Sequence, residues 1–162
     1  MTQTYIGTKL INALPMTRQR YNDFRGWQVP ADKSPDDEGY LVEYLDGGKP
    51  NTEMYAGYVS WSPKEQFDKA YRQTTGLPFG LAVEAMKRGK KVARAGWDGA
   101  GMFVYYVPAG KYPVRMEQIK GLFPDDLVPY RHYMALKTAQ GDVATWAPSC
   151  SDALADDWFI IE

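Results

Sequence analysis

The sequence contains very few of the side chains that bind metals or form disulfides. It has one cysteine, Cys150, and one histidine, His132. A single cysteine cannot form a disulfide within the chain, which is typical of proteins from reducing compartments. A zinc site of the usual kind needs three or four Cys, His or carboxylate ligands. We therefore expect no metal and no other cofactor.

A catalytic role for Cys150 would need a group that lowers the pKa of its thiol, such as a nearby histidine or a helix N-terminus. His132 is the one histidine that could do this, and its surroundings predict that it lies in a strand. The sequence does not say whether the two residues meet, so a structural role for Cys150 is the simpler interpretation.

The chain also lacks an excess of positive charge and any long hydrophobic run. It has 19 Lys and Arg against 20 Asp and Glu, a net charge of −1. Proteins that coat duplex nucleic acid usually carry a basic excess, so no such partner is expected, although a small anion needs only a few local donors. No segment is long and apolar enough to span a bilayer, and the N-terminus MTQTYIGTKL lacks a signal-peptide core. We expect a cytosolic protein with no membrane partner.

The sequence shows no motif of a known catalytic site. It has neither a G-x-S-x-G elbow nor a Walker phosphate loop. Gly96, Gly99 and Gly101 are spaced like a phosphate loop, but a strand pattern follows them where a helix would be needed. A hairpin turn is the better explanation of these glycines. We therefore expect a protein that is not an enzyme and has no catalytic residues.

What the chain does contain is the composition of a globular protein, with 44% hydrophobic and 24% charged residues. A break at Thr74–Pro78 predicts a small α+β N-terminal domain, residues 1–73, and a second domain, residues 77–162. In the first, we expect a polar helix from Pro15 to Phe24. A hairpin should turn at Asp46-Gly47-Gly48. A second helix should start at a capping box formed by Ser62 and Glu65.

The second domain has the pattern of an α+β fold in which a helix packs on a small antiparallel sheet. Apolar residues at helical spacing predict a helix over Phe79–Arg88. Residues 109–129, rich in Pro and Gly, should form an irregular excursion, and one helical turn is expected within 149–155. Strands are predicted at 91–95, 102–107, 130–138, 143–146 and 158–161.

Aromatic residues are abundant, with 12 Tyr, 6 Phe and 5 Trp. Trp97 lies among glycines, where it could be a structural residue at a strand end or a flat surface for a stacked ligand. Stacking of a base on an aromatic side chain is worth roughly 1–3 kcal/mol. Further along, Trp146, Ser149 and Asp152 could cap a short helix or contact the hydroxyls of a sugar. Both pairs of alternatives stay open.

Four ordered motifs give the second domain a specific resemblance. They are R-A-G-W at 94–97, K-T-A-x-G at 137–141, W-x-x-S-x-x-D at 146–152 and L-A-x-D-W at 154–158. Together they resemble the type-two Thoeris anti-defence proteins of bacteriophages. The resemblance implies a homotetramer in the cytoplasm of the infected bacterial host. Such proteins are sponges that hold a cyclic nucleotide immune signal, glycocyclic ADP-ribose, without cleaving it. Some relatives resemble sponges for the cyclic dinucleotides of CBASS systems.

The resemblance also implies a ligand site. Trp97 or Trp146 would stack on the adenine, and Ser149 and Asp152 would line the pocket between subunits. Further residues that we predict to contact the ligand are Arg94, Tyr105 and Arg131, since Arg binds phosphate with a two-pronged fork. The short family form has no counterpart to residues 1–73. A phage structural or host-interaction protein that uses the domain as a scaffold is the main alternative. An enzyme would have to rely on Asp152, Asp157 and His132.

Overall fold

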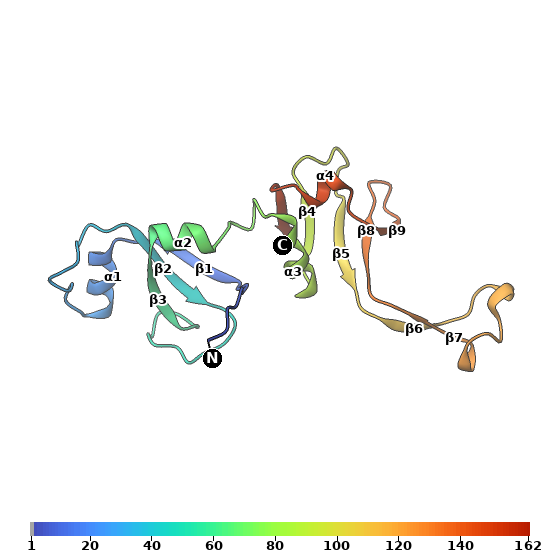
Figure 1. Ribbon diagram of the computed structural model, residues 1–162, viewed down its shortest axis with the longest axis horizontal. Coiled ribbons are helices and arrows are strands. Elements are labelled where there is room, and N and C mark those ends of the chain that lie inside the picture. The colour runs from blue at the N-terminus through green and yellow to red at the C-terminus, as the bar shows by residue number, and fades with distance from the viewer. Residues whose placement is uncertain (1) are drawn as a thin grey trace. The chain divides into compact units, whose positions relative to one another are not determined.

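The computed structural model describes residues 2–162, which form two compact units (Figure 1). The first ends at Arg72 and the second is Gln73–Glu162. No helix within the described residues is both long and apolar enough to cross a membrane.

The first unit is a three-stranded antiparallel sheet with two short helices. Its strands are β1 (Ile11–Pro15), β2 (Gly39–Tyr44) and β3 (Val59–Pro63), with β2 in the middle. Its helices are α1 (Arg18–Arg25) and α2 (Lys64–Ala70). The α1 side chain Tyr21 packs with Leu41 of β2 and Val59 of β3 to form the core.

The predicted pairing of two antiparallel strands, β2 and β3, is confirmed, but the turn predicted at Asp46-Gly47-Gly48 is wrong. β2 and β3 are antiparallel neighbours, but Glu43 pairs with Val59, so a long loop, residues 45–58, joins them. Local side chains explain the wide connection. The Asn51 amide makes two 2.8 Å hydrogen bonds to the backbone of Val59, and Gly57 N–H donates to the Glu43 carboxylate. These side chains bond to backbone groups of the loop that would bond to other backbone groups in a tight turn. The bonds therefore stabilise the wide loop.

The capping box predicted at Ser62 is also wrong. Ser62 still belongs to β3 and pairs with Tyr40, so its backbone is extended. The helix α2 starts one residue later than the box requires, after Pro63, and no side chain caps it. The predicted helix from Pro15 starts late as well. Pro15 ends β1, and α1 begins at Arg18 after a Thr17 cap.

The second unit confirms the predicted α+β fold. The helix α3 (Phe79–Lys87) lies on one face of a five-stranded antiparallel sheet of order β10-β4-β5-β8-β9. The strands are β4 (Lys91–Arg94), β5 (Phe103–Val107), β8 (Tyr133–Lys137), β9 (Val143–Trp146) and β10 (Trp158–Ile161). A one-turn helix, α4 (Cys150–Ala153), links β9 to β10.

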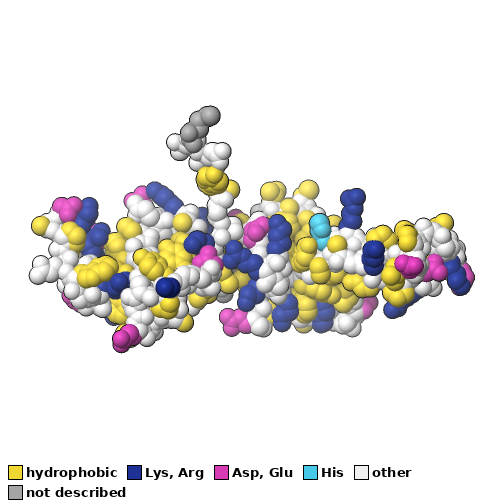
Figure 2. Space-filling view, turned by 90° about the horizontal axis from the view of Figure 1, so that it is seen from below, with side chains coloured by type: hydrophobic (Ala, Val, Ile, Leu, Met, Phe, Trp, Pro, Cys, Tyr) yellow, Lys and Arg dark blue, Asp and Glu magenta, His cyan; other side chains and the backbone are white. Residues whose placement is uncertain are grey.

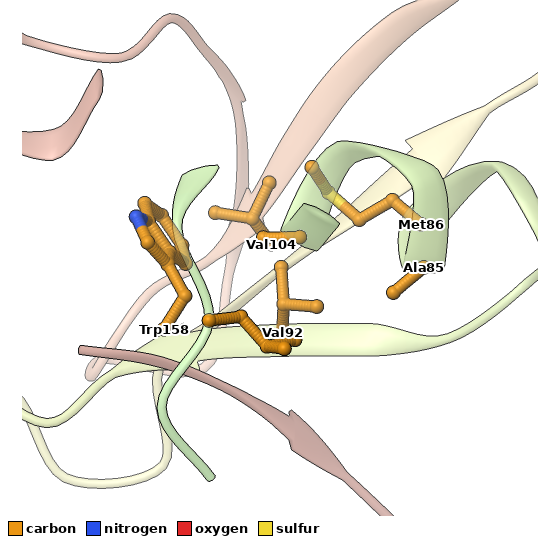
Figure 3. Close-up of a cluster of buried hydrophobic side chains, with 7 residues drawn as sticks. Ala85, Met86, Val92, Val104 and Trp158 are labelled. Carbon is orange, nitrogen blue, oxygen red and sulfur yellow. The ribbon is translucent and has the colours of Figure 1, made fainter. Parts of the chain in front are cut away.

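The core of this unit lies between α3 and the sheet (Figure 3). Met86 of α3 meets Val92 of β4, Val104 of β5 and Trp158 of β10, and all four are at most 1% exposed. Because side chains alternate along a strand, Tyr105, next to Val104, must point to the other face of the sheet. This alternation decides which predicted site residues can meet.

The segment predicted to be irregular is partly ordered. β6 (Gly110–Pro113) pairs with β7 (Leu127–Tyr130) in a two-stranded ribbon that leaves the five-stranded sheet (Figure 1). Two 3₁₀ turns, Glu117–Ile119 and Pro124–Asp126, form its tip. A ribbon of two edge strands accepts proline, which cannot donate to a ladder. The predicted strand 130–138 is interrupted, so His132 lies in the link between β7 and β8, against the ring of Tyr106.

Candidate functional site: three tryptophans beside Asp152

Three indoles meet at one end of the core. Trp97, in the turn after β4, lies edge-on against Trp146 and Trp158, with ring centroids 6.1 and 5.3 Å apart. Trp146 and Trp158 are themselves 5.9 Å apart. Trp158 is fully buried, whereas Trp97 and Trp146 are only half-buried. The sequence places these three residues in separate segments, and the sheet brings them together.

The carboxylate of Asp152 is the polar centre of this cluster. Its Oδ1 accepts from Arg94 Nη1 at 2.9 Å and from the Trp97 indole at 3.2 Å. Its Oδ2 accepts from the backbone N–H and the hydroxyl of Ser149, at 3.1 and 2.7 Å. The backbone carbonyl of Asp152 accepts the Trp158 indole N–H. Four donors fill the acceptor sites that a carboxylate offers.

Ser149 and Asp152 form a reciprocal capping box at the start of α4. The Ser149 hydroxyl accepts from the Asp152 backbone N–H, while the Asp152 side chain accepts from the Ser149 backbone. In this structure Ser149 therefore makes the contacts of a helix cap, which is the structural one of the two alternatives considered for it. The box fixes the direction of Asp152, and through it the orientation of Trp97.

Arg94 is held between two carboxylates. Its Nη1 meets Asp152 and its Nε meets Asp157 at 2.7 Å, and its side chain is 18% exposed. The other oxygen of Asp157 accepts from the Gly96 backbone N–H at 2.9 Å, in the turn that precedes Trp97. Arg94 is thus engaged by the protein itself, and a phosphate would have to compete with these two partners.

These contacts set the ionisation of the site. Burial raises the pKa of Asp152, but the hydrogen bonds from Ser149, Arg94 and Trp97 outweigh it and lower that pKa to about 2. The Arg94 hydrogen bond lowers the pKa of Asp157, and both carboxylates raise the pKa of Arg94. All three groups are therefore charged at neutral pH.

The remaining predicted site residues lie elsewhere. Tyr105 faces away from the core, on the opposite side of the sheet from the indoles. Arg131 is exposed in the link between β7 and β8. Cys150 is exposed in α4, and no hydrogen bond joins it to His132 within residues 2–162. Those residues also hold no group of three His, Cys, Asp or Glu that could bind a metal.

The segment that builds the cluster matches known proteins. The model of the Thoeris anti-defense 2-like domain matches residues 77–161. The chain belongs to this family. It is 32% identical over 87 residues to "Thoeris anti-defense 2" of Bacillus phage SP01, a match that covers 54% of this chain and 97% of that protein. The family supports a phage anti-defence role for this chain.

Within the Thoeris anti-defense 2-like domain, sequence reasoning missed two members of the cluster. The predicted ligand-site residues did not include Asp157 and Trp158, yet Asp157 orders the turn that carries Trp97. The L-A-x-D-W motif could have revealed both residues, because it places an acid directly before a tryptophan.

Proposed function

We propose that this protein binds a cyclic nucleotide immune signal in the infected bacterial cell and holds it without cleaving it. The observation that carries the proposal is the family match over residues 77–161, the same segment that assembles the indoles around Asp152. The expected signal is glycocyclic ADP-ribose, with the cyclic dinucleotides of CBASS systems as further candidates. Trp97 and Trp146 have half-exposed faces on which an adenine can stack.

The ionisation of the site supports sequestration over catalysis. A general acid or base works best when its pKa lies near the working pH. Asp152, with a pKa of about 2, and Asp157, whose pKa is also lowered, are poor proton donors and weak bases at neutral pH. A binding protein needs neither a proton donor nor a base. A fixed, charged frame that orients an indole favours tight binding because less motion is lost when the ligand arrives.

The oligomer is part of the proposal. We propose a homotetramer with pockets between subunits, and the β6–β7 ribbon offers a contact surface for it. Large apolar side chains of the ribbon and its tip are exposed: Tyr112, Met116, Leu122 and Tyr130. Exposed apolar groups on a projecting element are typical of subunit contacts. Light scattering coupled to gel filtration measures the mass, and a monomer would remove this part of the proposal.

Capture and release of the signal test the proposal directly. The full-length protein is incubated with glycocyclic ADP-ribose and filtered, and the retained fraction is heated and separated by chromatography. A sponge depletes the filtrate and releases the nucleotide intact after heating. Trp97→Ala should lose capture, whereas Trp27→Ala, an exposed tryptophan of the first unit, should retain it. Recovery of cleaved nucleotide would instead identify an enzyme.

A second candidate function is a phage structural or host-interaction protein that uses the domain as a scaffold. The observation that favours it is that this chain has an additional first unit, Met1–Arg72. The match with the phage SP01 relative spans 87 residues and covers 97% of that protein, which leaves no room in it for a counterpart of the first unit. Absence of capture for all cyclic nucleotides, together with a stable complex with one host or virion protein, would support this candidate.

A further inference from the structure

The sheet of the first unit has an open edge at β1. The bond from Met16 N–H to the Gly39 carbonyl, 2.9 Å long, continues the ladder between β1 and β2, so even-numbered residues face β2. Backbone groups alternate sides along an antiparallel strand, and Ile11, Ala13 and Pro15 therefore turn theirs outward. Within residues 2–162, no hydrogen bond is made by the outward N–H of Ile11 or Ala13. Proline, which has no N–H, is accepted at such an edge.

The opposite edge of the same sheet is covered. There the Asn51 side chain bonds to both backbone groups of Val59 in β3, and the strand ends at Pro63, which again has no N–H. Natural sheets protect their edges in such ways, because an open edge can pair with a further strand. In the described part of the chain nothing comparable covers β1, whose residues Asn12–Pro15 are all exposed.

A strand-forming segment without a partner strand precedes this open edge. Residues 4–10 read T-Y-I-G-T-K-L, with the β-branched and aromatic residues that are typical of strands. β2 ends at Tyr44, opposite the first residue of β1, and so does not extend along this segment. Residues 2–9 are all exposed, Tyr5 by 83% and Ile6 by 102%. Figure 2 shows the N-terminal segment standing clear of the first unit.

We propose that two copies of the chain pair through this edge, residues 5–15 of one against residues 5–15 of the other. The strands are antiparallel about a two-fold axis at Leu10, so residues 5–9 of each copy lie along the open β1 edge of its partner. Strand addition of this kind is a common mode of recognition, and the two-fold makes the contact self-complementary. It forms about ten backbone hydrogen bonds between the copies.

The side chains select this register. It places Ile6 of one copy beside Leu14 of the other, and since Leu14 is 48% exposed, two exposed apolar side chains cover each other. It also sets Leu10 beside its own copy on the axis. A slip of two residues in either direction would place Leu14 against Thr4 or Thr8 instead. A slip of one residue would turn the outward N–H groups away from their acceptors.

The inference goes beyond the proposed function. The contact lies in the first unit, which has no counterpart in the phage SP01 relative, and it involves no nucleotide. One strand from each copy is a small contact beside the roughly 1,200–2,000 Å² of a standard stable interface. We therefore expect this pairing to depend on protein concentration. Loss of nucleotide capture and loss of this contact are separate results, because different variants and different measurements test them.

Disulfide trapping in the full-length protein tests the contact. In a Cys150→Ser background, which removes the exposed native thiol, Leu10→Cys places a thiol on the two-fold axis. Residues opposite each other in such a pair have Cα atoms about 4.5 Å apart, a distance that a disulfide can span. Thr4→Cys is the matched control, because it lies on the same exposed segment but about 40 Å from its own copy. Mild oxidation at several protein concentrations, followed by non-reducing gel electrophoresis, measures the fraction of linked dimer.

Leu10→Cys should form linked dimers at least about fivefold faster than Thr4→Cys. Two further changes, each added to Leu10→Cys, should slow the linkage about fivefold or more. Ala13→Pro removes an N–H that β1 does not use within its own sheet, and Ile6→Lys places a charge in the apolar contact. Met54→Lys, at a position of the first unit that is 77% exposed, should leave the rate unchanged.

Thermal unfolding checks that each variant folds, and Ile6→Lys decides the matter if Ala13→Pro does not fold. The proposed contact is refuted if Leu10→Cys forms no dimer, or if Thr4→Cys links as fast as Leu10→Cys. It is also refuted if Ile6→Lys leaves the rate of linkage unchanged. A mixture of Ile6→Cys and Leu14→Cys proteins, both in the Cys150→Ser background, provides a second trap for the same register and should form the mixed dimer.

Discussion

Trp97 donates its indole N–H to the Oδ1 of Asp152 at 3.2 Å, although 55 residues separate the two in the chain. The bond connects the turn after β4 to the first turn of α4. Because the capping box at Ser149 already fixes Asp152, the orientation of this indole is set by a helix start far away in sequence. The family motifs R-A-G-W and W-x-x-S-x-x-D are thus two halves of one hydrogen-bonded unit.

The charge of Asp152 should stabilise the fold in a pH-dependent way. The pKa is lowered from 3.8 to about 2, which corresponds to roughly 2 kcal/mol of unfolding free energy. A carboxyl whose folded pKa is lowered stabilises the protein above its unfolded pKa and loses that contribution as the pH falls through the folded value. Asp152→Asn should therefore be less stable at pH 7, with a deficit that shrinks between about pH 4 and pH 2.

Urea denaturation at several pH values measures this deficit, and Asp156→Asn provides the matched control because Asp156 is exposed. A deficit for Asp152→Asn that stays constant down to pH 2 would show that lost hydrogen bonds, and not the charge, cause it.

The fork of Arg94 should not be replaceable by lysine. Lysine keeps the charge, but its three N–H donors share one nitrogen, whereas the guanidinium reaches Asp152 and Asp157 from two separate nitrogens of a planar fork. We expect Arg94→Lys to cost about 1–3 kcal/mol of unfolding free energy. Arg115→Lys in the exposed ribbon tip should change stability by less than about 0.5 kcal/mol. Thermal or chemical unfolding of the original protein and the two variants measures these differences. Equal stability of all three proteins would contradict the role of the Arg94 fork.

The Trp97–Asp152 bond should appear as a coupling free energy. Trp97→Phe keeps the aromatic packing against Trp146 and Trp158 and removes the N–H donor. In a double-mutant cycle with Asp152→Asn, the coupling should be about 0.5–2 kcal/mol, as for residues that share a hydrogen bond. Denaturant unfolding of the four proteins gives this number. A coupling near zero would mean that the two residues are neighbours without an energetic link.

Gly57 should tolerate no larger side chain. A Cβ at this position would lie 2.2 Å from the Tyr44 carbonyl oxygen, and the Gly57 N–H donates to the Glu43 carboxylate. Gly57→Ala should destabilise the protein by about 1–3 kcal/mol, because backbone must move to admit the methyl group. Gly7→Ala is the control, since nothing lies within 4 Å of its Cβ. Equal unfolding midpoints for the two variants would count against the open loop between β2 and β3.

The second unit should fold as an isolated fragment, residues 73–162. It has its own core around Trp158, and the phage SP01 relative is matched over 97% of its length within 87 residues. Circular dichroism and amide NMR spectra of the fragment should show a folded protein with dispersed signals. A spectrum typical of a random coil would mean that the first unit is needed for folding.

The sequence by itself determined the features that depend on residues close in the chain. Helical spacing from Phe79 onward predicted α3, because i, i+3 and i+4 positions share one side of a helix. Aromatic and branched residues predicted β5 to within a residue, and the strands predicted at 143–146 and 158–161 match β9 and β10. The cap at Ser149 was one of two alternatives weighed, since a serine three residues before an acid carries its own local signal.

The tertiary structure decided whatever depends on pairing between distant strands. It replaced the tight turn after β2 with a loop held by Asn51, and it paired β6 with β7 where the sequence predicted irregular chain. It also separated two predicted ligand residues, placing Trp97 and Tyr105 on opposite faces of one sheet. Strand register sets these outcomes, since a shift of one residue exchanges the two faces, and that register depends on pairing between strands that are far apart in the sequence.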